Sequence, residues 1–348
     1  MKSKQLLLAS LAGFTLASSL QADVTLVVTG GNASKSVLFD RAAAILTGPT
    51  IVNGPNANIR SYLNGTVPSQ PGLGHVTIHF VQNGAVLGLQ NLRDQVNVAT
   101  TSGGLTPQLA VSGTFPETVG IDSSIFTSAR TLVVPFVFIK NNSLPNSLHG
   151  VTNLTQRQIA YLQASSGTLP TAFFGGESTT DILWVIGRNT GAAVRQIIDA
   201  NIYFSGTPAF YTTNSANQPI LHPGGGGASG QEVTNILNVI SNSIGTVSSQ
   251  DVGPYIPLAY EGVAFNDANV INGSYPIWGY EAWYSKNSGS GQPSANQLAV
   301  INLLYNAVTD STYQHTPGNA FSTAKFVPLA DLQVERTADG GPITSTLY

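Results

Sequence analysis

The sequence of 348 residues contains no cysteine. It therefore forms no disulfide bonds, binds no metal through thiolates and offers no cysteine nucleophile. A lipid anchor attached to an N-terminal cysteine is excluded for the same reason. An exported chain without cysteine is typical of bacterial periplasmic or secreted proteins, and we expect this protein in one of those locations.

Charge is also scarce, because only 9% of the residues are Asp, Glu, Lys or Arg, against roughly a quarter in most globular proteins. The surface must be built mainly from Ser, Thr, Asn and Gln, which favours an exported protein. The formal net charge of −3 offers no basic surface, so we expect no nucleic-acid partner.

Residues 1–22, MKSKQLLLASLAGFTLASSLQA, have the pattern of a secretory signal peptide. Lys2 and Lys4 precede an apolar run that is too short to span a membrane, and we expect cleavage after Ala22. No later segment is long and apolar enough to cross a bilayer. The sequence therefore predicts no membrane insertion once the signal is removed.

Short β-rich runs alternate with amphipathic segments along the rest of the chain, which predicts an α/β architecture. The most apolar run, 131–142, suits a strand that is buried on both faces. Thr155 with Gln158, and Ser229 with Glu232, have capping-box spacing and predict the starts of two helices. Further strands are expected at 24–30 and 75–81, and further helices near 35–46, 85–92, 192–200 and 294–308.

Four strand-like runs end in a turn rich in Gly or Asn that opens a helix: TGGNASKS, QNGAVLG, GRNTGAAV and GGGGASGQ. Each is a candidate anion seat, although glycine also occurs there for geometric reasons alone. The first turn is not a phosphate-binding P-loop, because Ser34 and Thr29 stand where that motif needs glycine. Arg188 suits recognition of an oxyanion, or a salt bridge to an acid such as Asp181, whereas Arg195 is expected on the surface.

No catalytic or metal-binding group is legible in the sequence. The five histidines are scattered, and His75 and His79 share one face of a predicted strand. No Gly-x-Ser-x-Gly motif occurs, and Glu261 and Glu281 are isolated among aromatic residues. We therefore expect no enzyme, no metal and no cofactor. An aromatic group forms either packing or a platform for flat rings or sugars: Tyr275, Trp278, Tyr280, Trp283 and Tyr284.

The order of the segments resembles the periplasmic phosphate-binding proteins of ABC transporters, which are type II solute-binding proteins. The stretches that carry the resemblance are VVTGGNASKSVLFDRA, VPFVFIKNN, VTNLTQRQIAYL, WVIGRNTGAAVRQI, IPLAYEGVAFN, VINGSYPIWGYEAWY and FVPLADLQVERTADGGPI. The resemblance implies two α/β lobes, each a mixed sheet flanked by helices, joined by crossover hinge strands. We expect lobe one at 23–130 with 276–348, and lobe two at 131–275.

The resemblance also implies a ligand site between the lobes. The family's first loop matches Ser34, with its hydroxyl, and Lys35, with its backbone N–H. Its second loop has a Ser where this chain has Ala85, and its Asp has Thr101 as the nearest match. The fourth loop retains an arginine and a glycine but loses its hydroxyl groups, so that its positions read Arg188, Gly191, Ala192 and Ala193.

The missing hydroxyls have a large expected effect. Each lost hydrogen bond to a charged group costs on the order of 1.5–3 kcal/mol, so high-affinity phosphate scavenging is not expected. We expect a solute-binding protein that holds a small anion, phosphate or another oxyanion, and acts as a monomer with an ABC transporter permease. The alternative is a secreted or surface protein that keeps the fold as a structural or interaction module.

Overall fold

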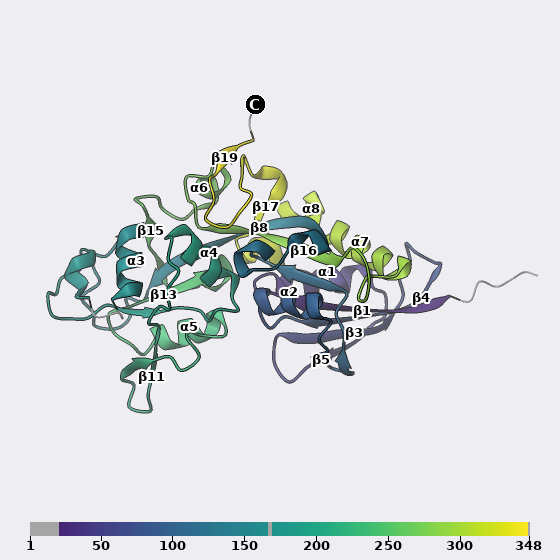
Figure 1. Cartoon of the computed structure of the whole chain (residues 1–348), viewed down its shortest axis with the longest axis horizontal. Helices are drawn as coiled ribbons and strands as arrows, with labels where there is room; N and C mark the ends of the chain where they lie inside the picture. The colour runs from purple at the N-terminus through teal and green to yellow at the C-terminus, as the bar shows by residue number, and fades with distance from the viewer. Residues whose placement is uncertain (1–20, 166–168, 347–348) are drawn as a thin grey trace, which may run out of the picture.

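The computed structural model describes residues 21–165 and 169–346, so that residues 1–20 of the predicted signal peptide lie outside it. The chain forms two lobes that lie side by side (Figure 1). Each lobe contains strands covered by helices, and the longest sheet runs through both. The predicted two-lobed α/β architecture is confirmed.

The sheet of the first lobe is mixed. Strand β1 (Ala22–Gly30) pairs in parallel with β4 (Leu73–Val81) and β7 (Leu109–Ser112). On the outer side, β3 (Ile59–Gly65) and β2 (Thr50–Asn53) add antiparallel edge strands. Helices α1 (Lys35–Ile45) and α7 (Ala295–Thr309) cover one face, and α2 (Ala85–Asp94) covers the other.

The sheet of the second lobe contains β10 (Trp184–Ile186) and β13 (Ser243–Ser248). Side chains alternate across a strand, and the long strand β8 (Phe126–Lys140) shows this clearly. Its Phe136 and Phe138 pack with α4 (Ala193–Asn201), whereas Val137 and Ile139 pack with α5 (Gly230–Leu237). Every residue from 131 to 140 is buried, as predicted for a strand enclosed on both faces.

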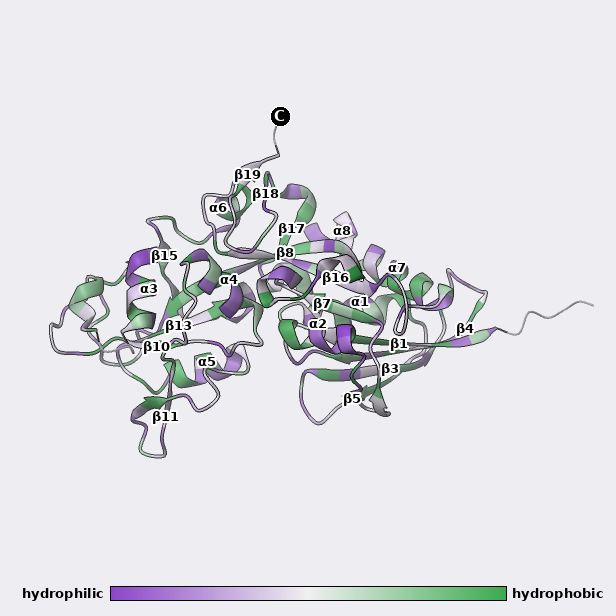
Figure 2. Cartoon of the chain, viewed as in Figure 1, coloured by the Kyte–Doolittle hydropathy of each residue, from purple (hydrophilic) through white to green (hydrophobic). Residues whose placement is uncertain are grey.

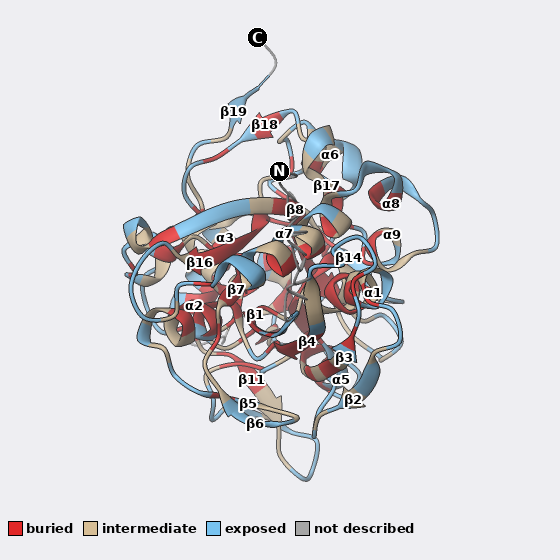
Figure 3. Cartoon of the chain, turned by 90° about the vertical axis from the view of Figure 1, so that its right-hand side faces the viewer, coloured by how far each residue is buried: buried red, intermediate tan, exposed pale blue. Residues whose placement is uncertain are grey.

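The long strand β8 joins the lobes. Residues 126–135 of β8 pair with β16 (Trp278–Lys286), and residues 136–140 pair with β13 of the second lobe. One strand therefore belongs to both lobes. Figure 3 shows the buried residues concentrated in the central strands, and Figure 2 shows apolar residues following those strands.

The remaining elements are short and lie around this frame. The further strands are β5 (Val98–Thr100), β6 (Gly103–Leu105), β9 (Asn153–Leu154), β11 (Tyr211–Thr213), β12 (Pro219–Leu221), β14 (Ile256–Pro257), β15 (Ala259–Tyr260), β17 (Val327–Pro328), β18 (Val334–Glu335) and β19 (Thr344–Ser345). The further α-helices are α3 (Gln156–Ala164), α6 (Asp267–Ile271), α8 (Ser311–His315) and α9 (Ala320–Thr323). The 3-10 helices are Pro116–Val119, Ser123–Ile125, Thr171–Phe174, Ser249–Asp251 and Leu329–Asp331. Within the described part of the chain, no helix is both long and apolar enough to cross a membrane.

The helix starts divide into two kinds. The predicted capping box of Thr155 and Gln158 is present at α3, and a second one joins Ser294 to Gln297 at α7. At α5 Ser229 accepts from the Glu232 amide, but the Glu232 carboxylate turns back to the Ala228 amide and completes no box. Helices α1, α2 and α4 differ, because no side-chain hydrogen bond caps them.

Candidate ligand site between the lobes

A small pocket lies where the three uncapped helices meet. Lobe one lines it with 31–33, 84–85 and Gly113, and lobe two with Arg188 and 192–194. Strands β8 and β16 add Phe136 and Glu281, and Ser248 closes the lining. The space between these residues is about 20 Å³, which is room for about one water-sized molecule.

The pocket is electropositive on its helical side. The loop that leads into α1 borders it through Ala33, and α2 and α4 border it through their first residues, Ala85 and Ala193. Each helix start carries unpaired backbone N–H groups and the positive end of the helix dipole. The convergence of three such ends is the arrangement that suits an anion. Sequence alone offered four candidate turns, and the structure brings three of them together.

Arg188 is the cationic side chain of the pocket, and it is 6% exposed. Its Nε donates to the carbonyl of Gly227 and its Nη2 to that of Ala228, both at 3.0 Å. Burial lowers the pKa of Arg188 to about 10, so the guanidinium is still charged at neutral pH. The predicted alternative of a salt bridge to Asp181 is wrong, since Asp181 instead accepts from the Ser147 hydroxyl.

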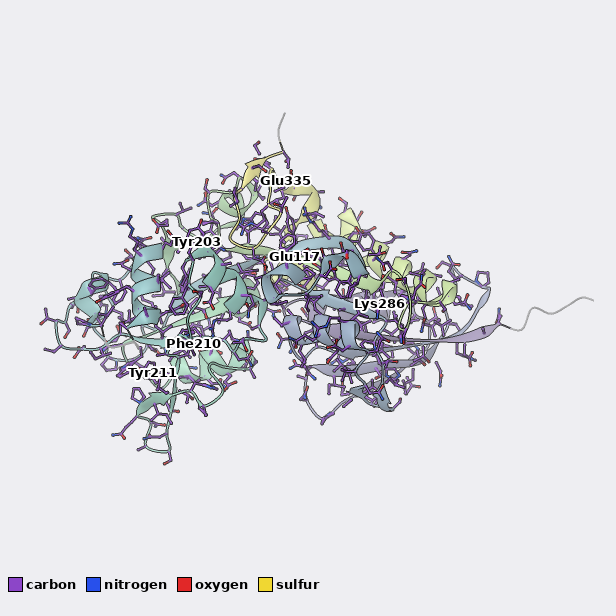
Figure 4. The ribbon with its side chains drawn as sticks, viewed as in Figure 1. Glu117, Tyr203, Phe210, Tyr211, Lys286 and Glu335 are labelled. Carbon is purple, nitrogen blue, oxygen red and sulfur yellow. The ribbon has the colours of Figure 1, made fainter. Side chains whose placement is uncertain are left out.

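The aromatic ring of Phe210 packs against the loop that carries Arg188. A side chain at Gly187 would place its Cβ 2.3 Å from the Phe210 ring, so only glycine fits there. Arg195 lies 5.0 Å from the centroid of the same ring and forms an ion pair with Asp199. The expectation that Arg195 is a surface charge is wrong, because it is buried and packs behind the loop. Figure 4 labels Phe210 within the second lobe.

The acidic group of the pocket is Glu281, on strand β16, which is 1% exposed. The Ser34 hydroxyl donates to its Oε1 at 2.5 Å. Burial raises the pKa of Glu281 to about 7, against the opposing effect of the Ser34 hydrogen bond. Glu281 therefore changes charge near neutral pH, in contact with the first helix start of the site.

Ser34 was expected at the site from the sequence, whereas Glu281 was interpreted as isolated among aromatic residues. The sequence did contain a signal for Glu281, because it is the only charged residue in the run 278–285, all of which is buried. A carboxyl group in such a run needs a partner, and its partner lies 247 positions away in the chain. The aromatic residues around it are packing, since Trp278, Tyr280 and Trp283 are each 3% exposed or less.

Two expected site residues lie elsewhere. The Thr101 hydroxyl donates to Ser61, whose hydroxyl contacts the buried ring of His79. The loop that enters the pocket follows β7 instead and brings Gly113, where a Cβ would lie 3.1 Å from Oε2 of Glu281. Lys35, expected to contribute its backbone N–H, is not among the residues that line the pocket, and its side chain donates to Asn58 at 2.8 Å.

Gly191 contributes through its backbone, and its partner lies in the other lobe. Its carbonyl accepts a hydrogen bond from the amide of Val86, in the first turn of α2, at 3.2 Å. Ala85, Ala192 and Ala193 line the pocket as expected. Among the described residues, no group of three His, Asp or Glu side chains could hold a metal ion.

Comparisons with known proteins identify the fold. No protein-family profile matches the chain, and no curated protein matches it. A solved structure from Clostridium perfringens, described as a phosphate ABC transporter substrate-binding protein with bound phosphate, superimposes with a TM-score of 0.58. It is 13% identical, and the match covers 88% of this chain and 100% of that one. The chain has the fold of phosphate-binding proteins.

Two further structures agree with this assignment. An ABC-type phosphate transport receptor from Vibrio cholerae matches with a TM-score of 0.51 at 12% identity, over 80% of this chain and 93% of that one. The high-affinity periplasmic phosphate-binding protein PfluDING, bound with phosphate, matches with a TM-score of 0.52 at 12% identity, over 88% and 91%. At these identities the likeness establishes the shared fold alone. It does not establish which ligand this chain binds.

Proposed function

We propose that the protein is a solute-binding protein that holds a small oxyanion, phosphate or a relative of it, between its two lobes. The observation that supports this most is the convergence of three uncapped helix starts and the buried Arg188 on one pocket. Backbone N–H groups and a guanidinium are the donors that oxyanions require.

The rest of the proposal follows from the sequence and the fold. The predicted signal peptide at 1–22 indicates export, so we propose a periplasmic or secreted monomer that delivers its solute to an ABC transporter permease. The lobe boundaries proposed from the sequence are 23–130 with 276–348 for lobe one and 131–275 for lobe two. The solved structures of similar fold are described as solute-binding or transport proteins rather than as enzymes.

Binding is expected to be weaker than in a phosphate scavenger. Ala85, Ala192 and Ala193 present methyl groups to the pocket, where hydroxyl donors would strengthen the hold on an anion. The donors that remain are the backbone amides and Arg188, because the Ser34 hydroxyl donates to Glu281. We therefore expect dissociation constants in the micromolar to millimolar range, which is roughly 4–8 kcal/mol of binding free energy.

Calorimetric titration of the mature chain with phosphate, sulfate, arsenate and nitrate tests the proposal. We expect heat from the tetrahedral oxyanions and none from chloride at the same ionic strength. An Arg188→Ala variant should lose this heat, while the matched variant Arg157→Ala, at an exposed arginine of α3, should keep it. No heat from any oxyanion at millimolar concentration would contradict the proposal.

The second candidate is an interaction module that keeps the fold without a solute. Two observations favour it: the pocket is only about 20 Å³, and the Gly191 carbonyl already occupies the Val86 amide. In that case the lobes stay in contact and no anion changes the thermal midpoint of unfolding. A rise of the midpoint with oxyanion concentration excludes this candidate.

A further inference from the structure

Glu281 lines the pocket and is hydrogen-bonded to Ser34, which directly follows the lining residue Ala33. This pair sets which hydrogen-bonding groups the pocket can offer. While Glu281 is ionised, its Oε1 accepts the single proton of the Ser34 hydroxyl. Ser34 then has only lone pairs for a ligand, and the carboxylate adds a negative charge. In that state both groups oppose an anion, although three helix starts attract one.

Protonation reverses the role of Glu281. A protonated carboxyl group has one O–H donor. Oε2 of Glu281 lies close to Gly113, and both residues line the pocket. Oε1 can still accept from Ser34, so that the pair remains intact. One proton thus removes a negative charge from the pocket lining and adds a hydrogen-bond donor to it.

We propose that the cleft takes up a fully ionised oxyanion, such as sulfate, together with one proton that resides on Glu281 and donates to the anion. This inference rests on the proposed function, because it concerns the selectivity of the same pocket. The proton comes from solvent and returns there when the ligand leaves. The site then accepts anions that carry no proton of their own, since the protein supplies it.

The surrounding charges leave Glu281 as the group that titrates. Among the described residues, Arg188 is the only other ionisable side chain that lines the pocket, and it is tied to carbonyl groups. Asp251 faces Arg188 and Lys35 from behind the pocket, and Tyr284 on β16 carries a pKa raised by burial. Among the charged residues near β16, Arg130 lies over the ring of Tyr280 on this same strand, and Asp339 and Glu117 act electrostatically on Tyr284. The other charged groups are engaged elsewhere: Lys140 on the Leu148 carbonyl, Arg93 on Asp94 and Arg195 on Asp199.

Sulfate is the informative probe, because it has no proton to gain or lose between pH 5.5 and 8.5, whereas phosphate does. We expect the dissociation constant of the wild-type chain for sulfate to rise about 30-fold from pH 5.5 to pH 8.5, as one-proton linkage to a group with a pKa near 7 requires. Calorimetry in two buffers of different ionisation enthalpy should show close to one proton taken up per sulfate at pH 8.5.

Glu281→Gln supplies a neutral amide donor of the same shape. It should bind sulfate equally at both pH values and without proton uptake. The exposed Glu335→Gln in the C-terminal segment is the matched control and should keep the wild-type pH dependence. Ser34→Ala removes the hydrogen bond that opposes the raised pKa of Glu281, so the variant should keep the pH dependence and shift it to higher pH.

A measurement on the wild-type chain covers the case in which Glu281→Gln does not fold. The carboxyl carbon of Glu281, followed by 13C NMR, should titrate at higher pH when sulfate is present. Sulfate binding that is independent of pH, or a Glu281 titration that sulfate does not move, overturns this inference and leaves the proposed function standing. Failure of every oxyanion to bind at either pH overturns both.

Discussion

The backbone amide of Val86 donates a hydrogen bond to the carbonyl of Gly191 across the cleft, at a distance of 3.2 Å. The amide belongs to the first turn of α2 in one lobe, and the carbonyl to the loop before α4 in the other. One of the N–H groups that could hold an anion is therefore already in use. An oxyanion that reaches this amide must displace the Gly191 loop, so that binding and movement of the lobes are coupled.

Gly84→Ala should weaken this contact. Gly84 has a φ of +146°, and a Cβ there would lie 3.0 Å from the Gly191 carbonyl oxygen. The backbone strain alone costs on the order of 1–3 kcal/mol, and separation of the lobes relieves the close approach. We expect faster hydrogen exchange at the Val86 amide and a larger radius of gyration in X-ray scattering. Gly72→Ala, which meets nothing within 4 Å, is the control, and equal behaviour of the two variants would refute the link.

Arg188→Ala should destabilise the second lobe as well as weaken anion binding. The substitution leaves the carbonyl groups of Gly227 and Ala228 without the guanidinium donor, and hydrogen bonds to charged donors contribute about 1.5–3 kcal/mol each. We expect a loss of about 3 kcal/mol in the free energy of unfolding by urea. The same loss for Arg157→Ala, at an exposed site, would show that the effect is not specific to this loop.

Glu281→Gln should change how stability depends on pH. The folded-state pKa of Glu281 is raised to about 7 from an ordinary 4.5, so the folded protein binds the proton more tightly than the unfolded chain does. Glu281 therefore contributes stability that is fully present below about pH 4.5, is lost as pH rises to about 7, and is absent above that.

The expected size of this effect is about 2 kcal/mol between pH 5 and pH 8, and Glu281→Gln should lack it. Urea titrations at the two pH values measure the difference in the free energy of unfolding between the wild type and Glu281→Gln. The contributions of the other acidic residues are common to both proteins and cancel in this difference. A difference that does not change with pH would mean that Glu281 titrates at the same pH in both states.

Asp339 ties the C-terminal segment to the loop beside the pocket. It accepts hydrogen bonds from the hydroxyls of Thr114 and Thr118 and from the amide of Phe115. Asp339→Ala leaves these three donors without their acceptor, and should cost about 2 kcal/mol of stability. Glu335→Ala, at an exposed position four residues earlier that is labelled in Figure 4, should be neutral. Unchanged thermal unfolding of Asp339→Ala would exclude an anchoring role.

The fold was predictable because its signals are local. The apolar run 131–142 suited an enclosed strand, and its residues 131–140 form the buried end of β8. The capping box at Thr155 placed the start of α3 correctly. The glycine turns marked the starts of α1, α2 and α4 in the same way. Each of these features depends on residues within a few positions of one another, which periodicity and capping rules describe well.

The site was predictable only in part, because its contacts are long-range. Ala85, Arg188, Ala192 and Ala193 were found from their loops and do line the pocket. Glu281 could not be placed there, since its partner is set by the order of strands in the sheet. Thr101 was expected at the site because it follows a predicted strand. That strand, β5, belongs to a separate two-stranded sheet, whereas the strand beside β1 is β7.

The sharing of β8 between the lobes has a mechanical consequence. Its pairing changes from β16 to β13 between Pro135 and Phe136, and the Phe136 amide is held by the Ile277 carbonyl at 2.9 Å. The two lobes are therefore not connected by a flexible linker. Any rotation of one lobe relative to the other must twist β8, whose hydrogen bonds continue from one lobe into the other. Phe136, where the pairing of β8 changes, also lines the pocket. A ligand in the pocket would therefore contact the point about which the lobes rotate.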